Sequence, residues 1–379
     1  MIRRFIQFDW VLFSAMILLS GVSILVLYGF SSDSKPEYFL RQSVFVVVGF
    51  LISVFVAGFD YRHIGKRSTA LYFSALGILF TVLLLGRTIR GTEGWIDLGF
   101  FQVQPVEFAK VVLVLFLASF ITKKKSELGE WTRLISSLVL TGAIVFLVMR
   151  QPDLGSSIVL LAVWGVMLLV SGIRLKHVLV LGMLGTLLVS GSWFFLEDYQ
   201  KARIESFVHP ELDPRGSGYN VLQAMVAVGS GGMFGKGIGH GSQSQSNFLP
   251  EKHTDFIFAS INEELGIAGA FLTLFLYGVI FYRLRVIGIQ SADNLGYLIT
   301  VGVYAMILVQ VVINIGMNVG LLPVTGIPLP FMSYGGSSIL SLFIAIGIVQ
   351  NVYRQRLGEQ YYVSQSRSDG DYIPFSYIK

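Results

Sequence analysis

Ten apolar runs, each a candidate membrane span, constrain this chain more than any other feature of its sequence. A hydrocarbon core of about 30 Å is crossed by roughly 17 to 25 apolar residues in a helix. The runs lie near residues 10–30, 42–59, 69–86, 104–122, 134–149, 157–173, 177–196, 256–282, 295–318 and 337–353. Of the 379 residues, 54% are hydrophobic and only 13% are charged. We therefore expect an all-α integral membrane protein with ten transmembrane helices.

The basic residues predict the orientation of these spans. The first run follows Arg3 and Arg4, and no small-residue cleavage site comes after it, so we expect a retained span with a cytoplasmic N-terminus. The inner segments then carry most of the lysines and arginines. The short outer loops hold only Lys35, Arg41, Arg87, Arg90 and Arg150. This bias also places the C-terminus in the cytoplasm, so the net charge of +5 reflects topology and no nucleic-acid partner is expected.

The chain divides into a ten-span membrane domain, residues 1–356, and a polar cytoplasmic tail, residues 357–379. One long outer loop, at about 197–255, separates the seventh and eighth spans, and loops of this length are usually functional. Residues 219–228 place apolar side chains on one face and predict an amphipathic helix on the membrane surface.

Several chemistries are excluded or disfavoured by composition. The chain has no cysteine, which removes disulfides, thiolate nucleophiles and iron–sulfur ligation, and its five histidines lack metal-site spacing. The glycine cluster 229–241 contains Gly235 and Lys236, but it does not match the phosphate-binding loop of nucleotidases. We therefore expect no nucleotide or organic cofactor.

Asp255 is the first candidate for function, because it places a carboxylate directly before the eighth apolar run. One interpretation is a simple helix cap, since aspartate is a preferred N-cap residue. The other is a general base or a ligand of a divalent cation at the outer leaflet. Lys252 and His253 lie close in sequence and are suited to a phosphate group.

Other polar residues lie beside or within the spans. Glu107 and Lys110 share a helix face at spacing i, i+3, which predicts either a neutralising pair or a lysine that counters an anionic headgroup. Asp153 has the sequence context of a helix cap.

A second group of polar residues lies in the last three spans. Gln310, Asn314 and Asn318 form a stripe that favours hydrogen bonding between helices, with cavity lining as the alternative. One or both of Glu263 and Glu264 must face the protein interior or water. The segment 323–338 has too many prolines and glycines for a regular span and is expected to line the same cleft.

Five segments together resemble the SEDS family (shape, elongation, division and sporulation). They are GWIDLGFFQVQPVEFAK at 94–110, QPDLGSS at 151–157, GYNVLQAMVAVGSGGMFGKGIG at 218–239, QSQSNFLPEKHTDFIFASINEELG at 243–266 and NVGLLPVTGIPLPFMSYGGSS at 318–338. They stand in the family's order and cover nearly the whole chain before the polar tail. The fourth segment is more similar to the rod-shape branch of the family than to the division branch. Val106 stands where the family often has a small polar residue.

The resemblance implies a multi-pass enzyme of the bacterial cytoplasmic membrane that serves cell elongation and rod shape. This peptidoglycan glycosyltransferase would polymerise lipid II at the outer face, displacing undecaprenyl diphosphate with inversion. The implied partners are a class B penicillin-binding protein, which is a transpeptidase, and the elongation machinery.

On this resemblance Asp255 matches the family's essential aspartate, and Glu107, Lys110 and Asp153 match positions that line its cavity. Positive charge for the leaving diphosphate would come from Lys110, Lys252, Arg41 or a divalent cation such as magnesium or manganese. Ser333, in the irregular segment, is a further expected substrate-binding residue. Two alternatives remain open, namely a flippase for the same lipid-linked precursor and a non-catalytic scaffold for the transpeptidase.

Overall fold

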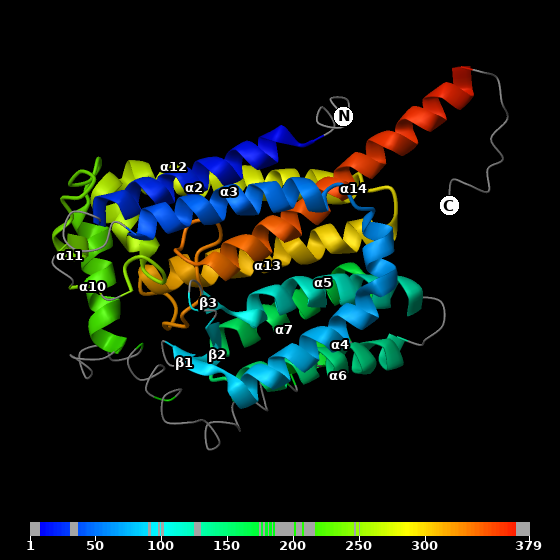
Figure 1. Ribbon diagram of the computed structural model, residues 1–379, viewed down its shortest axis with the longest axis horizontal. Helices are drawn as coiled ribbons and strands as arrows, with labels where there is room; N and C mark the ends of the chain where they lie inside the picture. Colours follow the sequence, from blue (N-terminus) through cyan, green and yellow to red (C-terminus); the bar gives the residue numbers. More distant parts are fainter. Residues whose placement is uncertain are drawn as a thin grey trace.

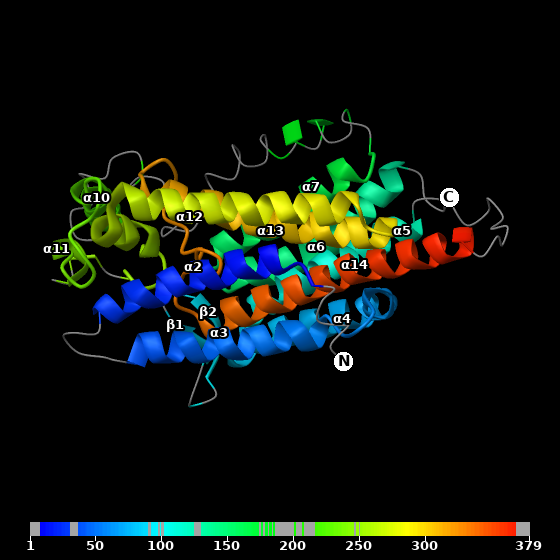
Figure 2. The same cartoon turned by 90° about the horizontal axis from the view of Figure 1, so that it is seen from above.

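The computed structural model describes residues 8–30, 37–89, 92–97, 102–124, 130–173, 217–245 and 251–368, with a few isolated positions between these ranges. Its long helices run side by side as one elongated bundle, and the short strands lie towards one end of it (Figures 1 and 2). The helices are α2 (Trp10–Gly29), α3 (Glu37–Val56), α4 (Tyr61–Leu85), α5 (Pro105–Lys124), α6 (Glu130–Arg150), α7 (Leu154–Val170), α10 (Ser217–Ser230), α11 (Ser242–Gln245), α12 (Ile257–Ile289), α13 (Asn294–Asn318) and α14 (Gly336–Ser368).

Eight helices in the described part of the chain are long and apolar enough to cross a membrane, and α7 is a shorter apolar helix. Together they coincide with nine of the ten runs in the sequence. The remaining run, near 177–196, lies mostly outside the described residues, as does the tail after residue 368. The membrane-protein class is confirmed, while the count of ten spans stays a prediction.

The bundle has an interior and a lipid-compatible exterior. Helices α5 and α14 are largely buried, and α13 packs against both of them. By contrast, the outward faces of α3 and α4 expose large apolar side chains such as Phe55, Phe73 and Leu84. Since water would penalise such surfaces, their exposure is consistent with contact with hydrocarbon.

A polar latch closes the bundle at the end opposite the strands. Asp9, the N-cap of α2, accepts hydrogen bonds from Arg283 Nη2 at 2.5 Å and Nε at 2.8 Å. Gln350 of α14 donates through Nε2 to the Asp9 carbonyl at 3.0 Å and accepts from the Asp9 backbone N–H at 2.9 Å. The beginning of α2 is thereby joined to both α12 and α14.

A small antiparallel sheet, with strand order β1-β2-β3, adds to the helical class at the other end of the bundle. Its strands are β1 (Arg87–Ile89), β2 (Thr92–Asp97) and β3 (Gln102–Val103). The buried Gln151 fastens the sheet, because its Nε2 donates to the Leu79 carbonyl at 2.9 Å and its own carbonyl accepts from Glu93 N at 3.3 Å. Residues 87–89, 92–97 and 102–103 therefore form a small pleated wall beside the helix ends.

Candidate active site

Four helices begin at one cavity of about 160 Å³ at the strand-bearing end of the bundle. They are α5, α7, α12 and α14, whose first residues come from distant parts of the chain. The cavity is lined by Thr92, Trp95, Gln104, Pro152, Asp153, Thr254, Asp255, Val324, Thr325, Gly326, Pro328, Tyr334, Gly335, Gly336, Ser337 and Ser338. Each helix start presents backbone N–H groups and the positive end of a helix dipole, so the arrangement favours negative charge.

Asp255 lines this cavity and is half-buried in the turn before α12. The cap interpretation of Asp255 is wrong, because α12 begins at Ile257 and Phe256 occupies the N-cap position. Its backbone is firmly held, since its carbonyl accepts from Asn314 Nδ2 at 2.9 Å and Asn318 Nδ2 at 3.0 Å. The carboxylate is therefore presented at the cavity by a fixed turn that precedes the N-cap of α12.

The asparagines of α13 confirm the prediction of hydrogen bonding between elements. Besides Asp255, Asn314 Nδ2 reaches the Ile327 carbonyl at 2.8 Å, and Asn318 Oδ1 accepts from Ala259 N at 3.0 Å. Both side chains are fully buried. They connect α13 to the start of α12 and to the irregular segment 323–335. Six residues of this segment line the cavity, which confirms the prediction that it lines the cleft.

Ser333 stabilises the turn that carries Asp255 through hydrogen bonds to backbone groups. Its Oγ donates to the Thr254 carbonyl at 2.5 Å and accepts from Leu329 N at 2.7 Å, and the side chain is buried. It is not among the described residues that line the cavity. The structure therefore places Ser333 as a support for the turn that carries Asp255, where the sequence suggested a contact with substrate.

Asp153 combines both of the roles considered for it. Its Oδ1 accepts from Ser156 N at 2.8 Å as the N-cap of α7, which confirms the cap prediction. Its Oδ2 accepts from Gln104 Nε2 at 3.4 Å, and both residues line the cavity. Two carboxylates, Asp153 and Asp255, thus face one small space.

Glu107 and Lys110 form a buried ion pair in α5. Lys110 Nζ lies 2.6 Å from Glu107 Oε1, and the side chains are only 2% and 3% exposed, respectively. Neither residue is among the described residues that line the cavity. Because burial of one charge without the other is costly, the geometry favours the neutralising pair over a free headgroup ligand.

The other basic candidates also lie away from the cavity wall. Lys252 Nζ donates to the Ser244 carbonyl and lies 4.9 Å from the centre of the Phe30 ring. Arg41 is exposed on α3. Among the residues that the structure describes, the cavity lining contains no lysine or arginine. Positive charge for an anion bound at this lining would therefore come from the helix N-termini.

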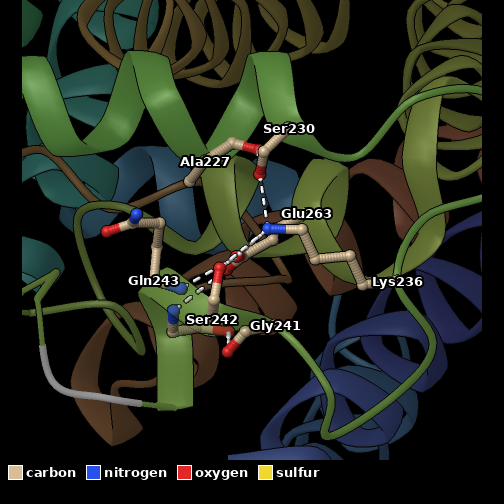
Figure 3. Close-up of polar contacts among 8 residues, drawn as sticks. Ala227, Ser230, Lys236, Gly241, Ser242, Gln243 and Glu263 are labelled. Carbon is tan, nitrogen blue, oxygen red and sulfur yellow. Dashed lines mark hydrogen bonds and ion pairs between the residues drawn. The ribbon is translucent and has the colours of Figure 1, made fainter.

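A glycine-rich loop, residues 229–241, is fastened to α12 by the buried carboxylate of Glu263 (Figure 3). This carboxylate accepts from Lys236 Nζ at 2.9 Å, from Gln243 N at 2.8 Å and from Ser244 N at 2.9 Å. Both Glu263 and Glu264 face the protein interior, which answers the question left open by the sequence. The segment leading towards Asp255 is thereby anchored to the helix that begins just after it.

The described residues contain no cluster of three or more His, Cys, Asp or Glu side chains that could hold a metal ion. The carboxylates of the described lining are Asp153 and Asp255, both hard ligands suited to magnesium or manganese. Either carboxylate could hold such a cation together with a substrate phosphate.

Comparison with known proteins agrees with this architecture. The family model for FtsW, RodA and SpoVE, described as "Cell cycle protein", matches residues 4–357. Peptidoglycan glycosyltransferase MrdB of Escherichia coli K12 is 39% identical over 313 residues, which are 82% of this chain and 84% of the relative.

Two solved structures are also similar. One, titled "Structural coordination of polymerization and crosslinking by a peptidoglycan synthase complex", matches with a TM-score of 0.80 and 31% identity, covering 92% of this chain and 98% of the other. The rod-shape-determining protein RodA of Thermus thermophilus matches with a TM-score of 0.69 and 28% identity, covering 92% and 97%. The chain therefore belongs to the SEDS family of FtsW, RodA and SpoVE.

Proposed function

We propose that this protein is a peptidoglycan glycosyltransferase that polymerises lipid II during cell elongation and rod-shape maintenance. The observation that carries the proposal is the cavity where Asp255 and Asp153 meet the beginnings of four helices. Family membership supports it, because MrdB is named as a peptidoglycan glycosyltransferase. The form of residues 243–258 favours the rod-shape branch.

The proposal includes the orientation of the molecule in the bacterial cytoplasmic membrane. We place both termini in the cytoplasm and ten spans in the bilayer, with the cavity and the sheet at the outer leaflet. The distribution of basic residues supports this orientation. A polymerase of a lipid-linked sugar needs its site at this depth, because the polyprenyl chain stays in the bilayer while the sugars extend from it.

The reaction is a single displacement. A hydroxyl of the incoming lipid II attacks the anomeric carbon of the growing chain, a new glycosidic bond forms, and undecaprenyl diphosphate departs from the opposite side with the bonding electrons. Asp255 takes the hydroxyl proton as the attack proceeds. Positioned bases of this kind contribute about 10²- to 10⁴-fold to a rate. No nucleotide is required, because the diphosphate linkage supplies the driving force.

We assign the base to Asp255, the position that matches the family's essential aspartate. Asp153 serves as the N-cap of α7 and also accepts from Gln104. The turn that carries Asp255 is fixed through backbone groups by Asn314, Asn318 and Ser333. A fixed backbone limits the motion of a base and so supports proton transfer at a defined point.

The leaving diphosphate needs positive charge, and the helix beginnings are suited to supply it. Residues 335–338 at the start of α14 line the cavity, and a helix N-terminus binds phosphate through its free N–H groups. The alternative role for Asp255 is as the ligand of a divalent cation, magnesium or manganese, which would neutralise further charge on the diphosphate.

We also propose that the chain works with a class B penicillin-binding protein as its transpeptidase and with the elongation machinery. A similar structure belongs to a synthase complex described as coordinating polymerization and crosslinking. The exposed apolar faces of the outer helices would accept a partner's single span.

The test is glycan polymerisation by the purified protein and its partner transpeptidase with lipid II. We expect strands from the wild type and none above background from Asp255→Asn, which keeps the shape of the side chain but removes the base. Asp97→Asn, an exposed carboxylate at the same end of the molecule that does not line the cavity, should retain activity.

Three results would contradict parts of the proposal. Equal strand formation by Asp255→Asn would remove Asp255 as the base. Flipping of lipid II in proteoliposomes without polymerisation would favour a transporter. Normal cell shape with Asp255→Asn as the only copy would favour a scaffold.

A further inference from the structure

Thr325 carries a hydroxyl that the protein itself does not satisfy. Its side chain lies on the cavity wall and the residue is only 8% exposed. Within the described part of the chain, Thr325 Oγ1 has no hydrogen-bond partner. A buried hydroxyl without a partner costs about 1–3 kcal/mol, so its position at a cavity points to a bound group that completes it.

The backbone on both sides of Thr325 is held close to the two carboxylates. A Cβ added to Gly155, in the first turn of α7, would lie only 2.8 Å from the Thr325 carbonyl oxygen, so glycine lets the segment approach the helix. The next residue, Gly326, has a φ of +74°, and a Cβ there would lie 3.7 Å from Asp255 Oδ2. Thr325 is thus fixed between the start of α7, capped by Asp153, and the carboxylate of Asp255.

The chemistry of the lining indicates what Thr325 contacts. The described lining contains six hydroxyl side chains, those of Thr92, Thr254, Thr325, Tyr334, Ser337 and Ser338, and two carboxylates. Lysine and arginine are absent from that part of the wall. Beside Thr325, hydroxyls and carboxylates suit a neutral group that both donates and accepts hydrogen bonds, whereas the diphosphate is assigned to the N–H groups at the start of α14.

We propose that Thr325 is a substrate-positioning residue that hydrogen-bonds a neutral polar group of a sugar ring, a hydroxyl or an acetamido group, beside Asp255. This inference rests on the proposed glycosyltransferase function and deepens it. The contact holds one sugar of lipid II in a fixed orientation relative to the base, and it does not take part in bond making.

Thr325→Val removes the hydroxyl while keeping the branched shape of the side chain. Since one neutral hydrogen bond is lost, we expect an increase of about two- to tenfold in KM for lipid II, with a smaller change in kcat. Thr325→Ser keeps the hydroxyl and should restore KM. The matched control is Thr141→Val in α6, because Thr141 Oγ1 is also buried and unpartnered in the described structure but does not line the cavity.

Thermal unfolding separates positioning from a structural role. Thr325→Val loses no hydrogen bond within the described protein, so its melting temperature should equal or exceed that of the wild type. A lower melting temperature together with an unchanged KM would overturn the proposal. So would a Thr325→Val enzyme whose KM matches that of the wild type and of Thr141→Val.

The stabilisation of the detergent-solubilised protein by added lipid II tests the contact without turnover. If the wild type fails to polymerise lipid II, the proposed function fails. The shift in melting temperature on adding lipid II then decides the role of Thr325 by itself. A smaller rise in melting temperature for Thr325→Val than for the wild type supports the contact. An equal rise, or no rise for the wild type, overturns it.

Discussion

Replacing Lys110 by methionine tests whether the pair in α5 is structural or catalytic. The variant keeps the length of the side chain but leaves the Glu107 carboxylate buried without its partner at 2.6 Å. Removing one member of a buried pair typically costs about 3–5 kcal/mol, because the remaining charge is neither solvated nor neutralised. We therefore expect Lys110→Met to be severely destabilised.

The double variant Glu107→Met, Lys110→Met sharpens this expectation. Both charges are then absent, and apolar side chains of similar volume often replace a buried pair at little cost. The double variant should therefore be more stable than either single variant. A surface comparison is Arg62→Met, since Arg62 Nε lies 2.8 Å from Asp293 Oδ2 but the two side chains are 38% and 32% exposed. Exposed pairs contribute only about 0–1 kcal/mol.

Thermal unfolding in detergent, monitored by tryptophan fluorescence, gives the order of stability. Polymerisation of lipid II is measured on the same samples. The expected order is wild type and Arg62→Met, then the double variant, then Lys110→Met. If Lys110→Met unfolds at the wild-type temperature yet fails to polymerise, the reasoning is refuted and Lys110 acts on the substrate. A double variant no more stable than Lys110→Met would also refute it.

Two further predictions concern Asn314 and Glu263, which hold the segments around the cavity in place. Asn314→Leu removes one of the hydrogen bonds to the Asp255 carbonyl, so kcat should fall about tenfold or more with little change in KM, as measured by steady-state polymerisation. Glu263→Gln keeps the shape of the side chain but removes the charge that Lys236 contacts. The loop 229–241 should therefore be cleaved faster by protease than in the wild type. Asp97→Asn is the control and should leave the cleavage rate unchanged.

The sequence predicted the membrane class and placed Asp153 and Asp255 at one site through the family resemblance. It also predicted the cap at Asp153 and the pair in α5, because both depend on neighbours within one helical turn. These are local relations, and local spacing determines them.

Contacts between distant segments could not be predicted in this way. Ser333 bonds the Thr254 carbonyl across 79 positions, so its role as a brace depends on tertiary packing. For the same reason the sequence could not show that Lys252 points to Ser244 and away from the cavity. The sequence does not single out Thr325, because a hydroxyl can be identified as lacking a hydrogen-bond partner only when the positions of all possible partners are known.

The latch at the far end of the bundle gives the cavity a mechanical connection to the opposite end of the molecule. Gln350, which holds Asp9, lies on the same helix as the cavity-lining Gly336, about 21 Å along its axis. A helix bonded at each turn moves as a rod, so a tilt of α14 at the latch also displaces residues 336–338. Binding of a partner near Asp9 and Arg283 would thus change the width of the cavity.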